Sequence, residues 1–97
     1  MTRLLLVQPE AERDLATARA WYDGRRAGLG DEFLDEVLLA MAELEREPER
    51  LRLYYRDFRR LRLRRFPYKI FYQVLGRRIV VFRVLHARQA HESELGR

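Results

Sequence analysis

The amino-acid sequence predicts an α+β fold in which a helical hairpin packs on one face of a small antiparallel sheet, in the order β-α-α-β-β-β. Between residues 9 and 47, apolar side chains recur at helical spacing on either side of a glycine-containing break. Between residues 59 and 86, apolar and charged side chains alternate with the period of two that is typical of strands. Because the chain has 97 residues, 47% of them hydrophobic, residues 1–97 are expected to form a single domain with one modest core.

The first strand and the first helix are predicted from the N-terminal part of the chain. Arg3–Val7 is a short apolar run without alternation, which favours a strand covered on both faces or nearly so. A helix is expected from Pro9 to Arg26, because proline suits a first helical turn and Glu10 and Glu12 place negative charge at the positive end of the helix dipole. Its buried stripe is predicted to consist of Ala11, Leu15, Ala18 and Tyr22, with Trp21 beside them.

A second helix follows a short turn. Gly28-Leu29-Gly30 ends the first helix, and Asp31 is a suitable N-cap for the next one, which ends before Pro48. A link this short makes the two helices an antiparallel hairpin. The core-facing stripe of the second helix is predicted to consist of Phe33, Leu34, Val37, Leu38, Met41 and Leu44.

The stretch Arg59–Tyr72 predicts a β-hairpin with one apolar and one cationic face. Leu61 and Leu63 point to one side, and the arginines between and beside them point to the other. With Phe66–Pro67 as the loop, apolar residues would pair across the strands, as a register set by a buried face requires. The expected cross-strand pairs are Leu63 with Ile70, Leu61 with Tyr72, and Arg64 with Lys69.

The remaining segments are less strongly patterned. Leu51–Tyr55 is either irregular or a short edge strand, and the polar tail Ala87–Arg97 either contains one helical turn or is loose. Ile79–His86 is expected to form the last strand after a three-residue turn at 75–77. That turn would place Val80, Phe82 and Val84 on the face of Ile70 and Tyr72, and Arg83 beside Lys69.

The net charge of +5 conceals a sharp asymmetry along the chain. Residues 1–49 contain 6 arginines and 12 acidic residues, a net charge of −6, whereas residues 50–97 contain 14 basic and 3 acidic residues, a net charge of +11. Such asymmetry predicts that the second half meets nucleic acid, an acidic protein surface, or both. The absence of cysteine, together with an N-terminal apolar run too short for a signal peptide or a membrane span, favours a cytoplasmic protein without membrane association.

The cationic face of the hairpin is the main candidate site. Like charges facing one another across strands are destabilising, so a chain that carries them is expected to have an anionic partner. The alternative is a solvated edge face whose charges prevent aggregation. The candidate binding residues are Arg60, Arg62, Arg64, Lys69, Arg83 and Arg88.

Evidence for catalysis in the sequence is limited. His86 ends the last strand and could act as a general acid–base, or it could be a strand-end histidine with a satisfied hydrogen bond. His91 lies in the polar tail, and the two histidines do not form a recognisable metal site. The sequence contains no nucleotide-binding glycine loop and no nucleophile elbow, so no cofactor is expected.

Several segments, in this order, resemble the RelE/ParE toxin superfamily of bacterial type II toxin–antitoxin systems. They are PEAERDL, GLGDEFLDEV, EREPER, RRLRLRRFPYKIFYQV and IVVFRVLHAR, and the resemblance covers about residues 3–90. It implies a compact toxin held inactive by a cognate antitoxin, which wraps the toxin with a helix or an extended segment. It also implies that the toxin meets operator DNA only through the antitoxin.

The resemblance is closer to the ParE-like branch, in the LGxxFLDE link, the RRFPYKIFY hairpin and the ending VLHAR. ParE-like toxins inhibit DNA gyrase by binding, so on this interpretation no residue is catalytic. The alternative is a RelE-like endonuclease that cuts messenger RNA in the ribosome. The family's nuclease arginine and tyrosine align with Gln89 and Leu95, so that set is incomplete here, and the nuclease candidates are Arg60, Arg62, Lys69, His86 and Arg88.

Overall fold

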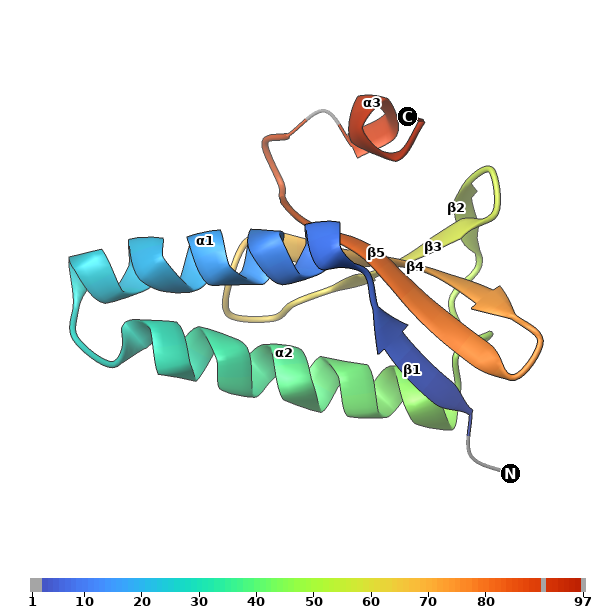
Figure 1. Cartoon of the computed structure of the whole chain (residues 1–97), viewed down its shortest axis with the longest axis horizontal. Coiled ribbons are helices and arrows are strands. Elements are labelled where there is room, and N and C mark those ends of the chain that lie inside the picture. Colours follow the sequence, from blue (N-terminus) through green and yellow to red (C-terminus); the bar gives the residue numbers. More distant parts are fainter. Residues whose placement is uncertain (1–2, 90, 97) are drawn as a thin grey trace.

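A computed structural model describes residues 3–89 and 91–96 and confirms the predicted α+β fold. The chain forms two layers, a five-stranded sheet and a hairpin of two antiparallel helices that covers one of its faces (Figure 1). The sheet has the strand order β1-β5-β4-β3-β2. The elements are β1 (Leu4–Val7), α1 (Pro9–Arg25), α2 (Leu29–Arg46), β2 (Leu53–Tyr55), β3 (Phe58–Arg62), β4 (Tyr68–Leu75), β5 (Arg78–His86) and α3 (His91–Leu95).

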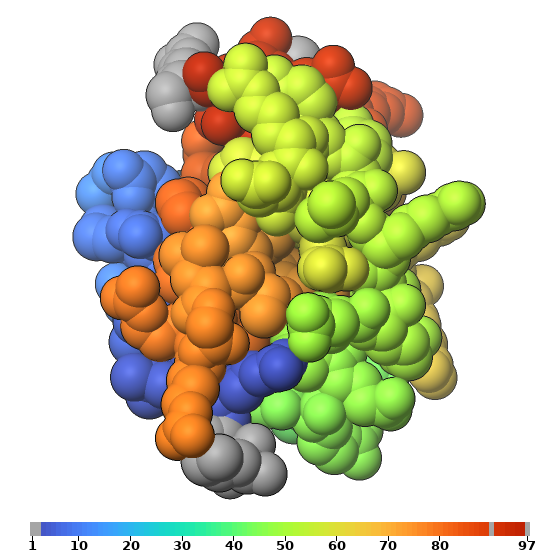
Figure 2. Space-filling model, turned by 90° about the vertical axis from the view of Figure 1, so that its right-hand side faces the viewer, coloured from blue at the N-terminus to red at the C-terminus, as the bar shows by residue number. Residues whose placement is uncertain are grey.

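The sheet is mixed rather than wholly antiparallel. The strand β1 pairs in parallel with β5, with Leu4 opposite Arg78 and Val7 opposite Val81, while the other neighbouring strands are antiparallel. The segment Leu51–Tyr55, for which the sequence allowed either an irregular structure or an edge strand, contains β2, a short edge strand beside β3. Seen from the end of the β4–β5 hairpin, the orange hairpin lies beside the blue N-terminal segment and the green segment that includes the end of α2 (Figure 2).

The helical hairpin depends on two glycines with different roles. Gly28 has a φ of +87° and makes the turn, because a left-handed backbone is readily accessible to glycine. Gly30 lies inside the first turn of α2, where its N–H donates to the carboxylate of Asp23 on α1 at 2.8 Å. The predicted core stripe of α2 is wrong at Leu38, which is 64% exposed.

The register of the β3–β4 hairpin differs from the prediction by two residues. Leu61 lies opposite Ile70 and Arg62 lies opposite Lys69, so the connection is longer than a two-residue loop. Phe66 accounts for the difference, since its ring is buried on the helix side within 5.3 Å of Phe33, centroid to centroid. A shift of two residues keeps every side chain on its face, so the predicted apolar and cationic faces are preserved.

The β4–β5 hairpin departs further from its predicted register than the β3–β4 hairpin does. Its turn has two residues, because Leu75 pairs with Arg78, and Gly76 adopts a φ of +61°. This inverts the first part of β5 relative to the prediction, so that Val81 lies opposite Tyr72. A bulge then shifts the register and returns Val84 to its predicted face of the sheet, where it lies opposite Ile70.

The two faces of the sheet carry separate apolar clusters. The larger one lies between the sheet and α1–α2 and includes Phe33, Ile70 and Tyr72, each fully buried. The smaller one lies on the outer face, away from the helical hairpin, and consists of Phe58, Phe71, Leu85 and Leu95, with Tyr54, Tyr55 and Phe82 packed against it. Because Leu95 belongs to α3, the C-terminal helix covers part of the outer face.

Candidate functional site

A cluster of three cations, Arg60, Arg62 and Lys69, lies on the outer face of the sheet. Leu61 and Ile70 belong to the helix-side core, so the residues that flank them in β3 and β4 point the other way. Arg62 is the direct cross-strand partner of Lys69. The Arg60 guanidinium lies 3.8 Å from the centroid of the Tyr54 ring, which holds it over the outer cluster. We call these three residues the cationic cluster.

The cationic cluster is electrostatically unbalanced. Partial burial, together with the positive charges of Arg60 and Arg62, lowers the pKa of Lys69. Within the described part of the chain, none of the three side chains forms an ion pair with a carboxylate. An anion bound here would relieve the repulsion, so the arrangement suits a phosphate or carboxylate ligand.

An open pocket of about 380 Å³ adjoins the cationic cluster. It is lined by Tyr54 and Lys69 from the sheet and by the segment that follows β5. The lining residues from that segment are Ala87, Gln89, His91, Glu92 and Ser93. The pocket therefore extends the candidate site from the cationic cluster towards α3.

Arg64 and Arg88, two other predicted binding residues, border this region without joining the cluster. Arg64 is exposed in the loop after β3, where its backbone N–H donates to the carboxylate of Glu36 on α2. Arg88 is exposed after β5, and its backbone N–H donates to Nδ1 of His86 at 3.0 Å. Both are available for contacts at the edge of a larger interface.

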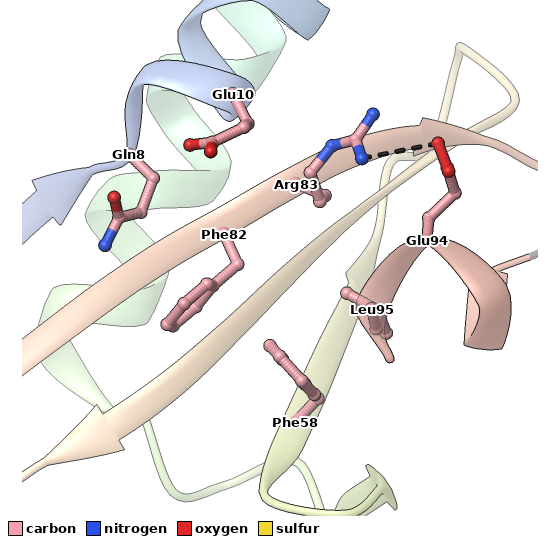
Figure 3. A pocket seen from close by; sticks show the side chains of 7 residues that line it. All are labelled: Gln8, Glu10, Phe58, Phe82, Arg83, Glu94 and Leu95. Atoms are coloured by element: carbon pink, nitrogen blue, oxygen red, sulfur yellow. Dashed lines mark ion pairs between the residues drawn. The ribbon is translucent and has the colours of Figure 1, made fainter. Parts of the chain in front are cut away.

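Arg83 was expected beside Lys69, and this placement is wrong. The residue across from Lys69 is Leu85, and Arg83 lies at the bulge of β5 with its guanidinium against α1. Its Nε and Nη2 donate to Asp14 at 2.7 and 2.9 Å. Its Nη1 lies 3.3 Å from Glu94 of α3, the ion pair drawn in Figure 3. These contacts raise the pKa of the Arg83 guanidinium and commit it to holding α1, β5 and α3 together.

His86 lies on the helix side, away from the cationic cluster. Its ring packs edge-on against Tyr68, at 5.1 Å between centroids, and Tyr68 packs against the helix-side core. Its Nδ1 accepts a hydrogen bond, as in the strand-end interpretation. The sheet does not bring this imidazole together with Lys69, so His86 is not placed to act as a general acid–base at the cluster.

His91 has a structural role that the sequence did not predict. Its side chain is buried, with Nε2 2.8 Å from the carbonyl oxygen of His86 and its ring 4.9 Å from that of Phe71, centroid to centroid. The polar sequence around it gave no sign of this burial. His91 thus attaches α3 to the sheet beside the candidate pocket.

A second concave surface lies between α2 and β3. This groove has a volume of about 500 Å³, and its apolar lining is formed by Leu39, Ala40, Leu61 and Leu63. Leu39 is 71% exposed, which is unusual for a large apolar side chain beside a core. Its charged lining consists of Glu36, Glu43, Arg46, Arg62, Arg64 and Arg65. The adjacent leucines Leu38 and Leu39, outside strict helical spacing, are the sequence signal that could have revealed it.

Neither a metal site nor a membrane span is found in the described structure. Among residues 3–89 and 91–96, no group of three or more histidine or acidic side chains is placed to hold a metal ion. None of the helices in the same residues combines the length and apolar character that crossing a membrane requires.

Comparison with known proteins shows the family and the fold. A family model described as the ParE toxin of the type II toxin–antitoxin system parDE matches residues 5–91. No curated protein matches in a sequence search. A chromosomal ParDE system from P. aeruginosa is similar in structure, with a TM-score of 0.79 at 17% identity over 87% of this chain and 95% of that one.

Two further solved structures share the fold. The RelBE2 toxin–antitoxin complex of Mycobacterium tuberculosis matches with a TM-score of 0.63 at 24% identity, covering 89% of this chain and 99% of that one. The intact RelBE complex of E. coli matches with a TM-score of 0.64 at 20% identity, covering 90% and 99%.

Proposed function

This chain belongs to the ParE toxin family of type II toxin–antitoxin systems, and from this premise we propose that it stops DNA replication by binding DNA gyrase. The observation that supports binding rather than catalysis is the composition of the outer face. It presents an aromatic ring and three cations that form no ion pair within the described residues, while His86 lies on the other side of the sheet. Such a surface can dock on an acidic or nucleic-acid-bound partner, and His86 is not placed to serve it as a general acid–base.

A RelE-like messenger RNA endonuclease is the second candidate. One observation favours it, since Arg60, Arg62 and Lys69 converge as a phosphate-neutralising set would. Two observations oppose it. The position that aligns with the family's catalytic tyrosine is Leu95, which is 7% exposed and packed in the outer cluster, and the position of the family's arginine is Gln89, whose side chain accepts the backbone N–H of His86 at 2.7 Å.

The proposed regulator is a cognate antitoxin that covers the cationic cluster, the α2–β3 groove, or both. The P. aeruginosa and RelBE neighbours are toxin–antitoxin systems or complexes, which supports a partner of this kind. The apolar lining of the groove and the arginines on its rim suit an amphipathic acidic segment. On this proposal, operator DNA is contacted only through the antitoxin.

The test is made on growing cells and on purified gyrase. After induction in a bacterium, thymidine incorporation is expected to stop before methionine incorporation, and the purified protein is expected to inhibit supercoiling by gyrase. The double variant Arg60→Gln, Lys69→Gln should lose both effects. A control with the same loss of charge is Arg13→Gln, Arg78→Gln, which changes two exposed residues outside the cluster and should retain them.

Arrest of protein synthesis before DNA synthesis would indicate the nuclease instead. If methionine incorporation stops first and messenger RNA is cut in translating ribosomes, the gyrase proposal is wrong and the RelE-like activity replaces it. If both double variants behave like the native chain, the cationic cluster is not the target-binding surface.

A further inference from the structure

Arg62 belongs to two sites at once. It forms part of the cationic cluster, because it is the cross-strand partner of Lys69 and its charge contributes to the lowered pKa of that lysine. It also lines the α2–β3 groove, together with Leu61 and Leu63 on either side of it in the chain. Arg60 and Lys69 do not line the groove, and Arg46, on the α2 side of the groove, does not belong to the cluster.

The groove itself is suited to one kind of occupant. Its lining on α2 extends from Glu36 to Arg46, a length of about 15 Å at the helical rise, which matches a partner helix of about three turns. The apolar lining requires an apolar stripe on that helix. Within the described residues, Arg46, Arg62 and Arg64 have no carboxylate partner for their side chains, so an occupant with acidic residues along its border would be favoured.

We propose that an amphipathic acidic helix bound in the α2–β3 groove captures Arg62 with a carboxylate and so withdraws it from the cationic cluster. The two sites then exclude one another through a shared side chain, without any need for their ligands to overlap. This inference rests on the proposed function in identifying the helix with part of the antitoxin and the cluster with the target-binding surface. It would allow the antitoxin to reduce target binding from the groove.

Because Arg62 is exposed, its side chain can turn from the cationic cluster to a carboxylate bound in the groove. The side chain is exposed at the end of β3 and has no ion pair to break within the described structure. A carboxylate in the groove would give it a charge-assisted hydrogen bond that the cluster does not provide. The cluster would lose one of its three positive charges, and the repulsion on Lys69 would fall.

The sequence offers a direct reporter of this event. Lys69 is the only lysine among the 97 residues, so a protein labelled with lysine carrying ¹³C at Cε gives one side-chain resonance whose titration reports the pKa of Lys69. The groove probe is a synthetic 14-residue peptide with leucines at helical spacing and glutamates along one border. A second peptide with glutamine in place of glutamate is its matched control. A short heparin oligosaccharide serves as the polyanion for the cationic cluster.

Three single variants of the full chain separate the sites. Arg46→Gln should weaken binding of the glutamate peptide by about two- to fivefold, the effect of one partly exposed ion pair, and should leave heparin binding unchanged. Arg60→Gln should weaken heparin binding and leave the peptide unaffected. Only Arg62→Gln should weaken both. Saturating glutamate peptide should reduce heparin affinity and raise the pKa of Lys69 in the native chain, and should do neither in Arg62→Gln.

Several results would overturn the inference. They are no binding of the glutamate peptide, equal binding of the glutamine peptide, an Arg62→Gln variant that affects only one ligand, or heparin competition that persists in Arg62→Gln. These assays do not involve gyrase. If the exclusion is observed but the protein does not inhibit gyrase, the proposed target is wrong while the coupling of the two sites stands.

Discussion

At the scale of single residues, Lys69 shows a conflict between stability and binding. Partial burial and the two arginines beside it make its positive charge unfavourable in the folded state, whereas an anionic ligand needs that charge. We expect Lys69→Gln to weaken heparin binding while raising the free energy of unfolding by no more than about 0.5 kcal/mol, since the amide removes the charge but leaves a polar group at the same half-buried position. Chemical denaturation and a binding titration on the same two proteins measure both effects. A clear loss of stability would contradict this account.

The same residue predicts a pH dependence with a definite sign. The folded pKa of Lys69 lies below its ordinary value of 10.5, so between the two pKa values the unfolded chain holds more protons. The cost of the charged lysine is therefore present below the folded pKa and disappears as the pH rises through it towards 10.5. The stability difference between Lys69→Gln and the native chain should shrink over that interval.

Asp14 is the residue on which the connection between α1 and β5 depends most. Its carboxylate accepts two hydrogen bonds from Arg83 and one from the backbone N–H of Val84 at 2.9 Å, and the Arg83 and Asp14 side chains are only 22% and 16% exposed. We expect Asp14→Asn to lower the free energy of unfolding by about 2 kcal/mol, because it leaves a half-buried guanidinium poorly paired. Urea denaturation measures the change.

A matched control for Asp14 is available on the other side of Arg83. Glu94 contributes a single contact at 3.3 Å, so Glu94→Gln should cost about 0.5 kcal/mol or less. Combining Asp14→Asn with Arg83→Gln should cost less than the sum of the single changes, since both remove the same interaction. Equal effects of Asp14→Asn and Glu94→Gln would show that the bidentate geometry has no special importance.

At the scale of elements, two glycines of the helical hairpin provide a matched experiment. A Cβ on Gly30 would lie 2.6 Å from the backbone oxygen of Arg19, whereas a Cβ on Gly24 would meet nothing within 4 Å. We expect Gly30→Ala to destabilise the protein by about 2 kcal/mol, since the helices would have to separate. Gly24→Ala should stabilise it by about 0.5–1 kcal/mol, because alanine is the better helix former. Thermal unfolding of both variants tests the pair, and similar behaviour would contradict the close approach.

The sequence predicted the elements and most of their faces, because those follow from local periodicity. The cationic face of β3 and the burial of Leu61 and Leu63 survived a register error of two residues, since only odd shifts exchange the faces of a strand. The direction of β1 and the bulge in β5 were not predictable in the same way. They arise from contacts between distant segments, such as Asp14 with Val84, which leave no periodic trace in the sequence.

The candidate site, like the fold, was predictable from the sequence only where it depends on local periodicity. Arg60, Arg62 and Lys69 come together because they share two neighbouring strands, and strand alternation alone places them on one face. Arg83 is absent from the cluster because the register sets it opposite Phe71 instead of Lys69, and because Asp14 of α1 holds its guanidinium. The α2–β3 groove joins elements well separated in the chain, and its only signal in the sequence is the pair of adjacent leucines Leu38 and Leu39.

At the scale of the whole molecule, the acidic first half and the basic second half form different layers. The acidic residues lie mainly on and around the helical hairpin, and most of the arginines lie in the sheet and its connections. Contacts such as Arg65 with Glu32, at 2.8 Å between charged atoms, join the two layers and neutralise part of the asymmetry. Within the described residues, Arg60, Arg62 and Lys69 have no such carboxylate partner, so their positive charge remains at the proposed binding surface.

The stability of the molecule also depends on its C-terminal helix, α3, which covers part of the outer face of the sheet. Leu95 and His91 of α3 are buried against the outer cluster, so α3 completes a second, smaller core that the helical hairpin cannot reach. We expect a chain ending at Gln89 to lose about 2 kcal/mol or more of stability, because Phe58, Phe71 and Leu85 would become exposed to water. Urea denaturation gives the loss, and an increase in the fluorescence of an apolar dye reports the exposed surface.

The truncated chain also separates the roles of the two faces. The cationic cluster lies in β3 and β4, so heparin binding should survive the truncation if α3 only covers apolar surface. The point variant Glu92→Gln, at an exposed position of α3, should leave stability and dye binding unchanged and serves as the control. If the truncated chain keeps its full stability, the outer cluster does not need α3. If it loses heparin binding while remaining folded, the pocket beside Lys69 is part of the anion site, and α3 contributes to binding as well as to folding.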